Sequence, residues 1–244
     1  MSHFTIIELD TTDSTNAFAS ALLSGKKAGC NTVVTAKHQE KGKGQGSNQW
    51  ESEYGLNLLC SIIICPELIN AFDQFRISKI TSLAIRDCLA ELGLSTSVKW
   101  QNDIMAGKKK IAGMLIENTI FKDNISSSVI GIGININQEK FDKLEQKAGS
   151  VLTETGKYHD LGKVLTILLE KFEAWQSLLA DNETDTIDRE YLKNLYGLNT
   201  FLPFRKGNST FDAMITGVDE TGELFLRRRD GKILKVVFRE IEYL

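Results

Sequence analysis

The sequence predicts an α+β protein with a mixed, largely antiparallel sheet, flanking helices and a small all-β module at its C-terminal end. Three observations lead to this prediction. Strand-like runs in the first half are joined by hairpin turns rather than by regular strand–helix alternation. Apolar residues recur at helical spacing in a few long segments. From Thr200 onward, turn residues appear about every ten positions, which is typical of short antiparallel strands.

The first elements follow from local residue preferences. Phe4–Leu9 and Thr32–Ala36 mix β-branched and apolar residues, so both are expected to be strands. Between them we expect a helix that Asp13 or Ser14 caps and that Gly25 ends.

The next stretch contains a long polar loop followed by apolar elements. Lys37–Tyr54 holds glycines, amides and charges, and a long loop inside a compact domain is often functional. Leu56–Ile64 is too apolar for a solvated face, so we place it centrally in the sheet. Ala71–Leu92 has helical spacing and stops at a glycine, and Ser97–Trp100 is strand-like.

The rest of the first domain is predicted as a hairpin, a strand and two helices. Ile104–Met105 and Lys110–Asn118 pair across a polar turn, and Ser127–Asn135 forms the next strand. Helices are expected at about 160–180 and 186–196.

The pattern changes near residue 198, so we expect a first domain over 1–198 and a barrel of SH3-like size over 199–244. The module should pack against the first domain, because no low-complexity linker separates the two.

Composition restricts the class of protein. Apolar residues make up 42% and charged residues 25% of the 244 residues, as in an ordinary globular protein. The net charge of -3 does not favour a nucleic-acid-binding protein. The N-terminus lacks a signal-peptide pattern, and the most apolar stretch is too short to span a bilayer. A cytoplasmic protein with no DNA or membrane partner is therefore expected, and the oligomeric state stays open, including a homodimer.

The four cysteines, at positions 30, 60, 65 and 88, have neither zinc-site spacing nor the density of a secreted disulfide scaffold. We expect reduced, mostly buried thiols, and no metal site.

The segment Gly42-Lys43-Gly44-Gln45-Gly46 is the first candidate for chemistry. Glycines let backbone N–H groups approach an anion, and a lysine adds charge. The segment is neither a Walker A loop nor a dinucleotide-binding fingerprint, and alone it would more simply be a solvated loop. Trp50 closes the loop with a ring suited to stacking on adenine.

Four other segments contribute polar or small residues. Lys99-Trp100-Gln101-Asn102-Asp103 offers a cation and a carboxylate at a strand end, although Trp100 fits the core. Ala112-Gly113 and Gly131-Ile132-Gly133 clear strand faces for a flat ligand or another backbone. Asp13-Ser14-Thr15-Asn16 is a simple helix cap by itself, or else a helix N-terminus that binds a polar ligand.

In this order and spacing, these segments resemble those of biotin protein ligases, over the first 137 residues. The resemblance implies the fold shared with class II aminoacyl-tRNA synthetases and lipoate ligases, with an SH3-like C-terminal module. It implies that biotin and ATP form biotinyl-5′-AMP, with Mg²⁺ held mainly by the phosphates. Biotin would then pass to a lysine of a biotin carboxyl carrier domain.

The roles carried by the resemblance are assigned residue by residue. Lys99, Lys43 and Asp103 would be catalytic, with Asp103 positioning the acceptor lysine or the metal. The implied biotin-binding residues are Ser14, Thr15, Asn16, Gln39, Gly42, Lys43, Gly44, Lys99, Ala112 and Gly113. The implied ATP-binding residues are Lys43, Trp50, Asn102, Lys110 and Asn135.

Some positions depart from the family. Its loop usually carries arginine at the positions of Lys43 and Gly46, and often at Gln45, so Lys43 is expected to bind the phosphate without their help. Proline is usual where Gln101 stands. Relatives with a DNA-binding helix-turn-helix have it before the motif that starts here at Asp13, which predicts a ligase without a repressor function.

The same residues also fit two alternative functions: a lipoate or octanoate ligase, and a non-catalytic biotin-binding regulator. RNA binding through Arg227-Arg228-Arg229 is less favoured than a solvated hairpin, given the negative charge.

Overall fold

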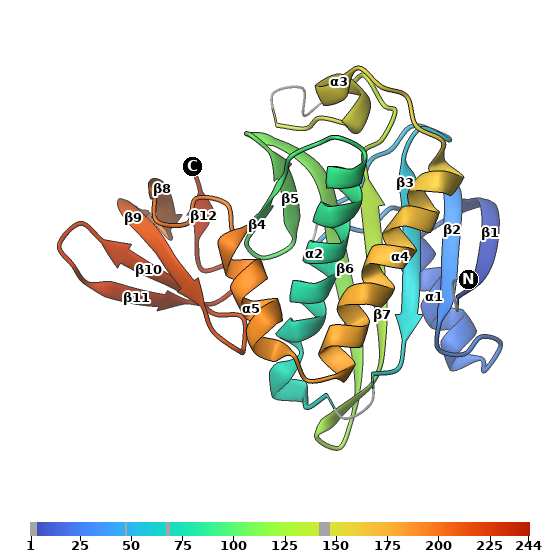
Figure 1. Ribbon diagram of the computed structural model, residues 1–244, viewed down its shortest axis with the longest axis horizontal. Helices are drawn as coiled ribbons and strands as arrows, with labels where there is room; N and C mark the ends of the chain where they lie inside the picture. Colours follow the sequence, from blue (N-terminus) through green and yellow to red (C-terminus); the bar gives the residue numbers. More distant parts are fainter. Residues whose placement is uncertain (1–3, 47, 67–68, 142–146) are drawn as a thin grey trace.

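A computed structural model describes residues 4–46, 48–66, 69–141 and 147–244. Its larger sheet has seven strands, and a smaller five-stranded sheet follows at the C-terminal end (Figure 1). The strands of the larger sheet are, in spatial order, β1 (Thr5–Thr12), β2 (Thr32–Gln39), β3 (Leu58–Ile64), β7 (Asn124–Ile134), β6 (Lys109–Phe121), β5 (Asp103–Ala106) and β4 (Ser97–Lys99).

The larger sheet is mixed and largely antiparallel, as predicted, because β1 and β2 run parallel and the other neighbouring strands run antiparallel. The predicted hairpin is formed by β5 and β6. The helices are α1 (Thr15–Ser24), a 3-10 turn (Ala71–Asp73), α2 (Phe75–Glu91), α3 (Val151–Thr155), α4 (Leu161–Ala180) and α5 (Thr184–Lys193). Of these, α3 was not predicted, because five residues are too few to show a helical period.

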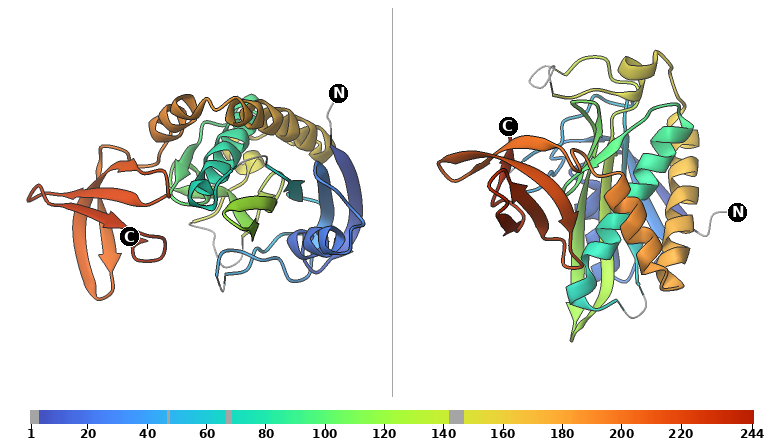
Figure 2. Two further views of the ribbon diagram at one scale, coloured as in Figure 1. Left: turned by 90° about the horizontal axis from the view of Figure 1, so that it is seen from below. Right: turned by 60° about the vertical axis from the view of Figure 1, so that its left-hand side comes forward.

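The two faces of the larger sheet carry different helices (Figure 2). Helices α2 and α4 cover one face, and α1 packs on the opposite face against β2, β3 and β7. Alternate residues of β3 divide accordingly: Cys60 and Ile62 join the core under α2 and α4, whereas Ile63 joins the cluster under α1. All residues of β3 are buried, which confirms its predicted internal position in the sheet.

The C-terminal module is an antiparallel sheet, as predicted, and it packs against the larger sheet. The indole N–H of Trp100, a buried residue, donates to the Gly222 carbonyl at 2.9 Å, and the Phe238 ring lies 6.3 Å from the Trp100 ring. The SH3-like barrel and the boundary at residue 198 stay predictions, because one hydrophobic cluster continues across both sheets. The module's strands, in spatial order, are β11 (Ile233–Val236), β10 (Leu224–Arg228), β9 (Ser209–Val218), β8 (Phe201–Lys206) and β12 (Glu242–Tyr243).

The cysteine prediction is wrong for one pair. Cys30 and Cys65 form a disulfide with a Cα–Cα distance of 5.5 Å. The two residues flank the antiparallel β2–β3 pair, whose register matches Thr32 with Ile63 and, continued outward, brings Cys30 opposite Cys65. Sequence spacing did not show this register. Cys60 and Cys88 are free and buried, as expected, and burial raises the pKa of both thiols to about 12.

No helix within the described residues combines the length and the apolar character needed to cross a membrane.

Candidate functional site

One row of residues across the larger sheet forms the floor of the candidate site. Lys99 pairs with Asp103, Asp103 with Gly113, and Gly113 with Gly133 on four successive strands. Directly opposed residues point to the same side of a sheet. These four residues therefore face the side away from α2 and α4, with Lys99 at one end of the row and the two glycines at the other.

The indole of Trp50 lies on the surface that the glycines clear. A Cβ added at Gly133 would come within 2.9 Å of Trp50 Cδ2, and one at Gly113 would come within 3.2 Å of Trp50 Cζ3. The Lys110 ammonium lies 5.5 Å from the centre of the Trp50 ring. The sequence predicted that a flat ligand or a backbone would approach this surface, and in the structure the flat group is a side chain of the protein itself.

The start of α1 forms one wall of the site. Ser14 is the N-cap residue, but its side chain makes no capping hydrogen bond. Instead, the Gln39 side-chain oxygen accepts from the Thr15 backbone N–H at 2.7 Å and lies 3.1 Å from the Thr15 hydroxyl. Gln39 therefore satisfies a donor at the helix end that the buried Ser14 side chain does not cap.

Asn16 forms the second part of this wall and is held tightly. Its amide nitrogen donates to Glu117 Oε2 at 2.8 Å and to the Leu115 carbonyl at 3.2 Å, and its oxygen lies 2.6 Å from Ser61 Oγ. A Cβ added at Gly131 would come within 2.8 Å of Asn16 Cγ. The absence of a side chain at Gly131 is therefore what admits Asn16 to the sheet surface.

These walls enclose a cavity of about 470 Å³, including the part that is open to solvent. Its lining includes residues predicted from the sequence, namely Ser14, Thr15, Asn16, Gln39, Lys43, Gly44, Trp50, Asn102, Lys110 and Gly113. It also includes Gln45, Met114, Leu115, Gly131, Ile132 and Gly133, which the assignment of roles omitted. The alternate glycines at 131 and 133 were the signal that could have added those two positions.

The glycine loop borders the cavity, and backbone hydrogen bonds within the loop hold its shape. The Gly44 N–H donates to the Asn48 carbonyl at 2.8 Å, and the Trp50 N–H donates to the Gly42 carbonyl at 2.9 Å. These bonds draw the loop into a narrow hairpin that carries Lys43 at an exposed position and returns Trp50 to the sheet. Ser47, which belongs to the same predicted loop, lies outside the described residues.

A second cation lies beside this loop, and it belongs to the turn between β11 and β12. The Arg239 guanidinium lies against Gly46, where an added Cβ would come within 3.0 Å of Arg239 Cζ. Lys41, also in the loop, is engaged elsewhere in an ion pair with Asp13 at 2.9 Å. The turn between β11 and β12 thus places an arginine beside the loop. The sequence could not show this, since the two positions lie far apart in the chain. That Lys43 binds the phosphate without the loop arginines usual in the family stays a prediction.

Lys99 sits beside a group of charged residues at the end of the floor. Burial is the main cause that lowers the pKa of Lys99, and the neighbouring cations Lys110 and Lys147 lower it further. The carboxylates of Asp103 and Glu242 raise the pKa of Lys99. Lys110 and Asp103 form an ion pair at 2.6 Å, so the carboxylate is already partnered.

Five predicted residues do not line this cavity: Gly42, Lys99, Asp103, Ala112 and Asn135. Gly42 borders the adjoining hollow together with Lys43, and Lys99 and Asp103 lie at the end of the floor. Ala112 is buried in the core under α2 and α4, because it is next to Gly113 on a strand and so points to the other face. It therefore does not form the floor of the cavity.

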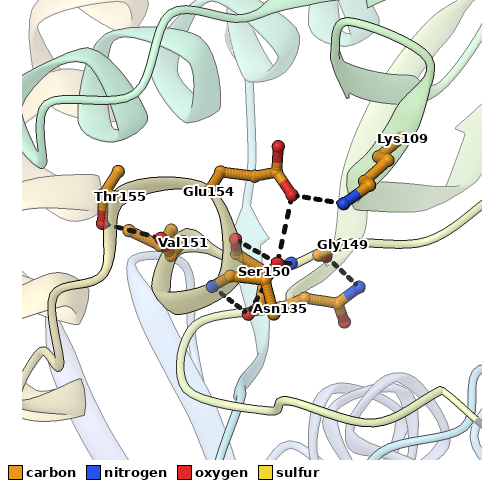
Figure 3. Close-up of polar contacts among 8 residues, drawn as sticks. Lys109, Asn135, Gly149, Ser150, Val151, Glu154 and Thr155 are labelled. Atoms are coloured by element: carbon orange, nitrogen blue, oxygen red, sulfur yellow. Dashed lines mark hydrogen bonds and ion pairs between the residues drawn. The ribbon is translucent and has the colours of Figure 1, made fainter. Parts of the chain in front are cut away.

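Asn135 holds the chain segment that leads into α3 (Figure 3). Its amide donates to the Gly149 carbonyl at 3.0 Å. Helix α3 begins there with a capping box between Ser150 and Thr153, and Lys109 pairs with Glu154 at 2.8 Å. The Asn135 side chain is thus engaged within the protein.

Within the described residues, no group of three or more His, Cys, Asp or Glu side chains could hold a metal ion.

Comparison with known proteins places the chain among relatives. The model of the biotin/lipoate A/B protein ligase family matches residues 8–135. The bifunctional ligase/repressor BirA of Bacillus spizizenii is 30% identical over 224 residues, which are 90% of this chain and 68% of that protein. The biotin–[acetyl-CoA-carboxylase] ligase of Paracoccus denitrificans is 28% identical over 234 residues, 92% of this chain and 95% of that one.

Solved structures share the fold. The biotin protein ligase from Aquifex aeolicus in complex with biotin and ATP superposes with a TM-score of 0.81, at 24% identity and with 98% of each chain covered. The family model matches more than half of the chain, and a relative is 30% identical to it, so this chain is a member of the biotin/lipoate A/B protein ligase family.

Proposed function

We propose that the protein is an ATP-dependent biotin–protein ligase. A biotin carboxylate oxygen attacks the α-phosphorus of ATP, forming biotinyl-5′-AMP and releasing pyrophosphate. A lysine amine of a biotin carboxyl carrier domain then attacks the carbonyl of this anhydride, forming an amide and releasing AMP with loss of a proton.

The observation that carries the proposal is one cavity lined by two chemically different groups of residues. One group, Ser14, Thr15 and Asn16, brings hydroxyl and amide groups to a sheet surface that has no side chains of its own at Gly131 and Gly133. This combination suits a flat, polar, uncharged ring system such as the biotin ureido group. The ligase names of the relatives support the same assignment.

The other group of lining residues is cationic. Lys43 and Lys110 line the cavity, and Lys99 lies at the end of its floor. Three lysines can stabilise the charge that develops as a carboxylate joins a phosphate. We assign catalytic roles to Lys99 and Lys43. Asp103 is proposed to position the acceptor lysine, which requires that it exchange its partner Lys110.

ATP is proposed to bind beside the glycine loop. Trp50 would lift from Gly113 and Gly133 and stack on the adenine, and Asn102 and Lys110 would contact the nucleotide. Mg²⁺ is proposed to arrive with ATP, bound by its phosphates, as part of the substrate. Asn135 would contribute by holding the segment before α3 rather than by direct contact through its engaged amide.

The proposed partner is a biotin carboxyl carrier domain of a biotin-dependent carboxylase, in the cytoplasm. We propose no DNA partner, and a homodimer remains open.

Labelled biotin and labelled lipoate, each supplied with ATP and candidate carrier domains, distinguish this function from its alternatives. Transfer of biotin to a carrier lysine is expected. Transfer of lipoate alone would assign the chain to the lipoate branch. Tight biotin binding without biotin-dependent pyrophosphate release would indicate a non-catalytic regulator.

A further inference from the structure

The ammonium of Lys99 lies 4.8 Å from the centre of the Tyr243 ring. Lys99 ends β4 of the larger sheet, whereas Tyr243 belongs to β12 of the C-terminal sheet (Figure 1). A cation within about 6 Å of an aromatic ring centre is attracted by the negative face of the ring. Within the described part of the chain, the Lys99 ammonium has no hydrogen bond or ion pair, so this ring is the contact that holds it.

The charged groups around Lys99 explain why a ring is a useful partner there. Asp103 on β5 is the closest candidate carboxylate on the same floor, but Lys110 on β6 already pairs with it. Two other charged groups act on the pKa of Lys99, which Lys147, before α3, lowers and Glu242, on β12, raises. A salt bridge would neutralise a lysine that must bind an anion during the reaction. An aromatic face can hold the same ammonium and leave its charge available.

Tyr243 is itself held in place by its neighbours. It pairs with Phe204 across β12 and β8, and the two ring centres are 4.9 Å apart. The centre of the Tyr196 ring lies 6.5 Å from that of Tyr243. The Tyr243 hydroxyl is buried and has no hydrogen-bond partner among the described residues. The contact with Lys99 therefore uses the face of the ring and not its hydroxyl.

The strand that carries Lys99 is also joined to the chain segment that leads into the C-terminal sheet. The Val98 N–H donates to the Asn194 carbonyl at 2.8 Å, and the Tyr196 N–H donates to the Val98 carbonyl at 2.8 Å. Lys99 and the aromatic cluster are thus fixed relative to one another by backbone hydrogen bonds one residue away from the lysine.

We propose that Tyr243 is a positioning residue for Lys99, so that the C-terminal sheet completes the catalytic centre by holding the lysine without neutralising it. This inference rests on the proposed ligase function, in which Lys99 stabilises the carboxylate and the α-phosphate as they join.

The test compares Tyr243→Phe, which keeps the ring, with Tyr243→Leu, which keeps an apolar side chain but has no ring. Tyr196→Leu is the matched control, because it alters the same aromatic cluster without touching the ammonium. Biotin-dependent pyrophosphate release is followed at saturating biotin, and kcat/KM for ATP is measured across alkaline pH. The thermal midpoint of each variant is recorded to establish that it is folded, and Tyr243→Met replaces Tyr243→Leu if the latter does not fold.

Tyr243→Phe should retain the wild-type kcat/KM. Tyr243→Leu should lower it by about 2- to 30-fold, which is the range expected for loss of a cation–π contact. Because the ring favours the charged lysine, its loss should also move the alkaline limb of the profile to lower pH, by about 0.4 to 1.5 pH units. Tyr196→Leu should leave the limb in place.

An equal loss in Tyr243→Leu and Tyr196→Leu with an unmoved alkaline limb would overturn the inference, and so would a loss in Tyr243→Phe as large as in Tyr243→Leu. Absence of biotin-dependent pyrophosphate release from the wild-type protein would instead overturn the proposed function.

Discussion

The substitution Gly131→Ala should lower both the stability of the fold and the affinity of the site for biotin. The added Cβ would come within 2.8 Å of Asn16 Cγ and 3.0 Å of Asn16 Nδ2. Asn16 cannot move aside freely, because Glu117, Leu115 and Ser61 hold its amide. Gly131 itself lies in the middle of a strand that is paired on both sides.

The size of the effect follows from these contacts. Overpacking a buried site costs about 1–3 kcal/mol, and loss of one hydrogen bond of Asn16 adds about 1 kcal/mol. The free energy of unfolding should therefore fall by about 2–4 kcal/mol. For a chain of this length that corresponds to a thermal midpoint lower by about 4–16 °C.

Differential scanning calorimetry measures the stability, and isothermal titration measures biotin affinity at a temperature where the variant is folded. Gly29→Ala is the matched control: its Cβ would meet nothing within 4 Å, so its stability should stay within about 1 kcal/mol of wild type. A thermal midpoint and a biotin affinity of Gly131→Ala equal to those of the control would contradict the claim that Asn16 needs a glycine at position 131.

The remaining predictions concern the cations and the disulfide. Lys99→Ala should abolish biotin-dependent pyrophosphate release while the circular dichroism spectrum stays that of the wild type, and normal release would remove Lys99 from the mechanism. Lys43→Ala should speed the dissociation of biotinyl-5′-AMP about tenfold in a filter assay, as expected for loss of a charged hydrogen bond. Arg239→Gln should speed it in the same direction, because its guanidinium lies beside the loop; unchanged off-rates in both variants would refute the role of these cations. Thiol titration of the denatured, unreduced protein should detect two thiols, with four after reduction, and four before reduction would refute the Cys30–Cys65 bond.

Most of the fold could be predicted from local patterns. The largely apolar run Leu56–Ile64 indicated an internal strand, and Gly25 marked the end of α1, because short-range preferences decide such features. Helix α3 was missed, since its start depends on a capping box within a very short segment. The Cys30–Cys65 disulfide depends on the register of β2 against β3, which no spacing rule contains.

The position of a candidate site residue could be predicted where its own segment determines that position. Thr15, Gln39 and Lys110 all line the cavity, because each belongs to a motif at the end of an element. Ala112 was assigned to the wrong face, since strand alternation separates it from Gly113. The sequence around Tyr243 contains no pattern that indicates a functional residue. Its contact with Lys99 forms only when the C-terminal sheet packs against the larger sheet.

Transfer of labelled biotin to a carrier-domain lysine tests the central claim most directly. With ATP, Mg²⁺ and a biotin carboxyl carrier domain, the wild-type protein should form a stable biotinyl-lysine amide, with one pyrophosphate and one AMP released per biotin transferred. A substitution of the acceptor lysine in the carrier should stop the transfer but leave biotinyl-5′-AMP formation intact. If biotin is neither adenylated nor transferred while lipoate is, the protein is not a biotin ligase.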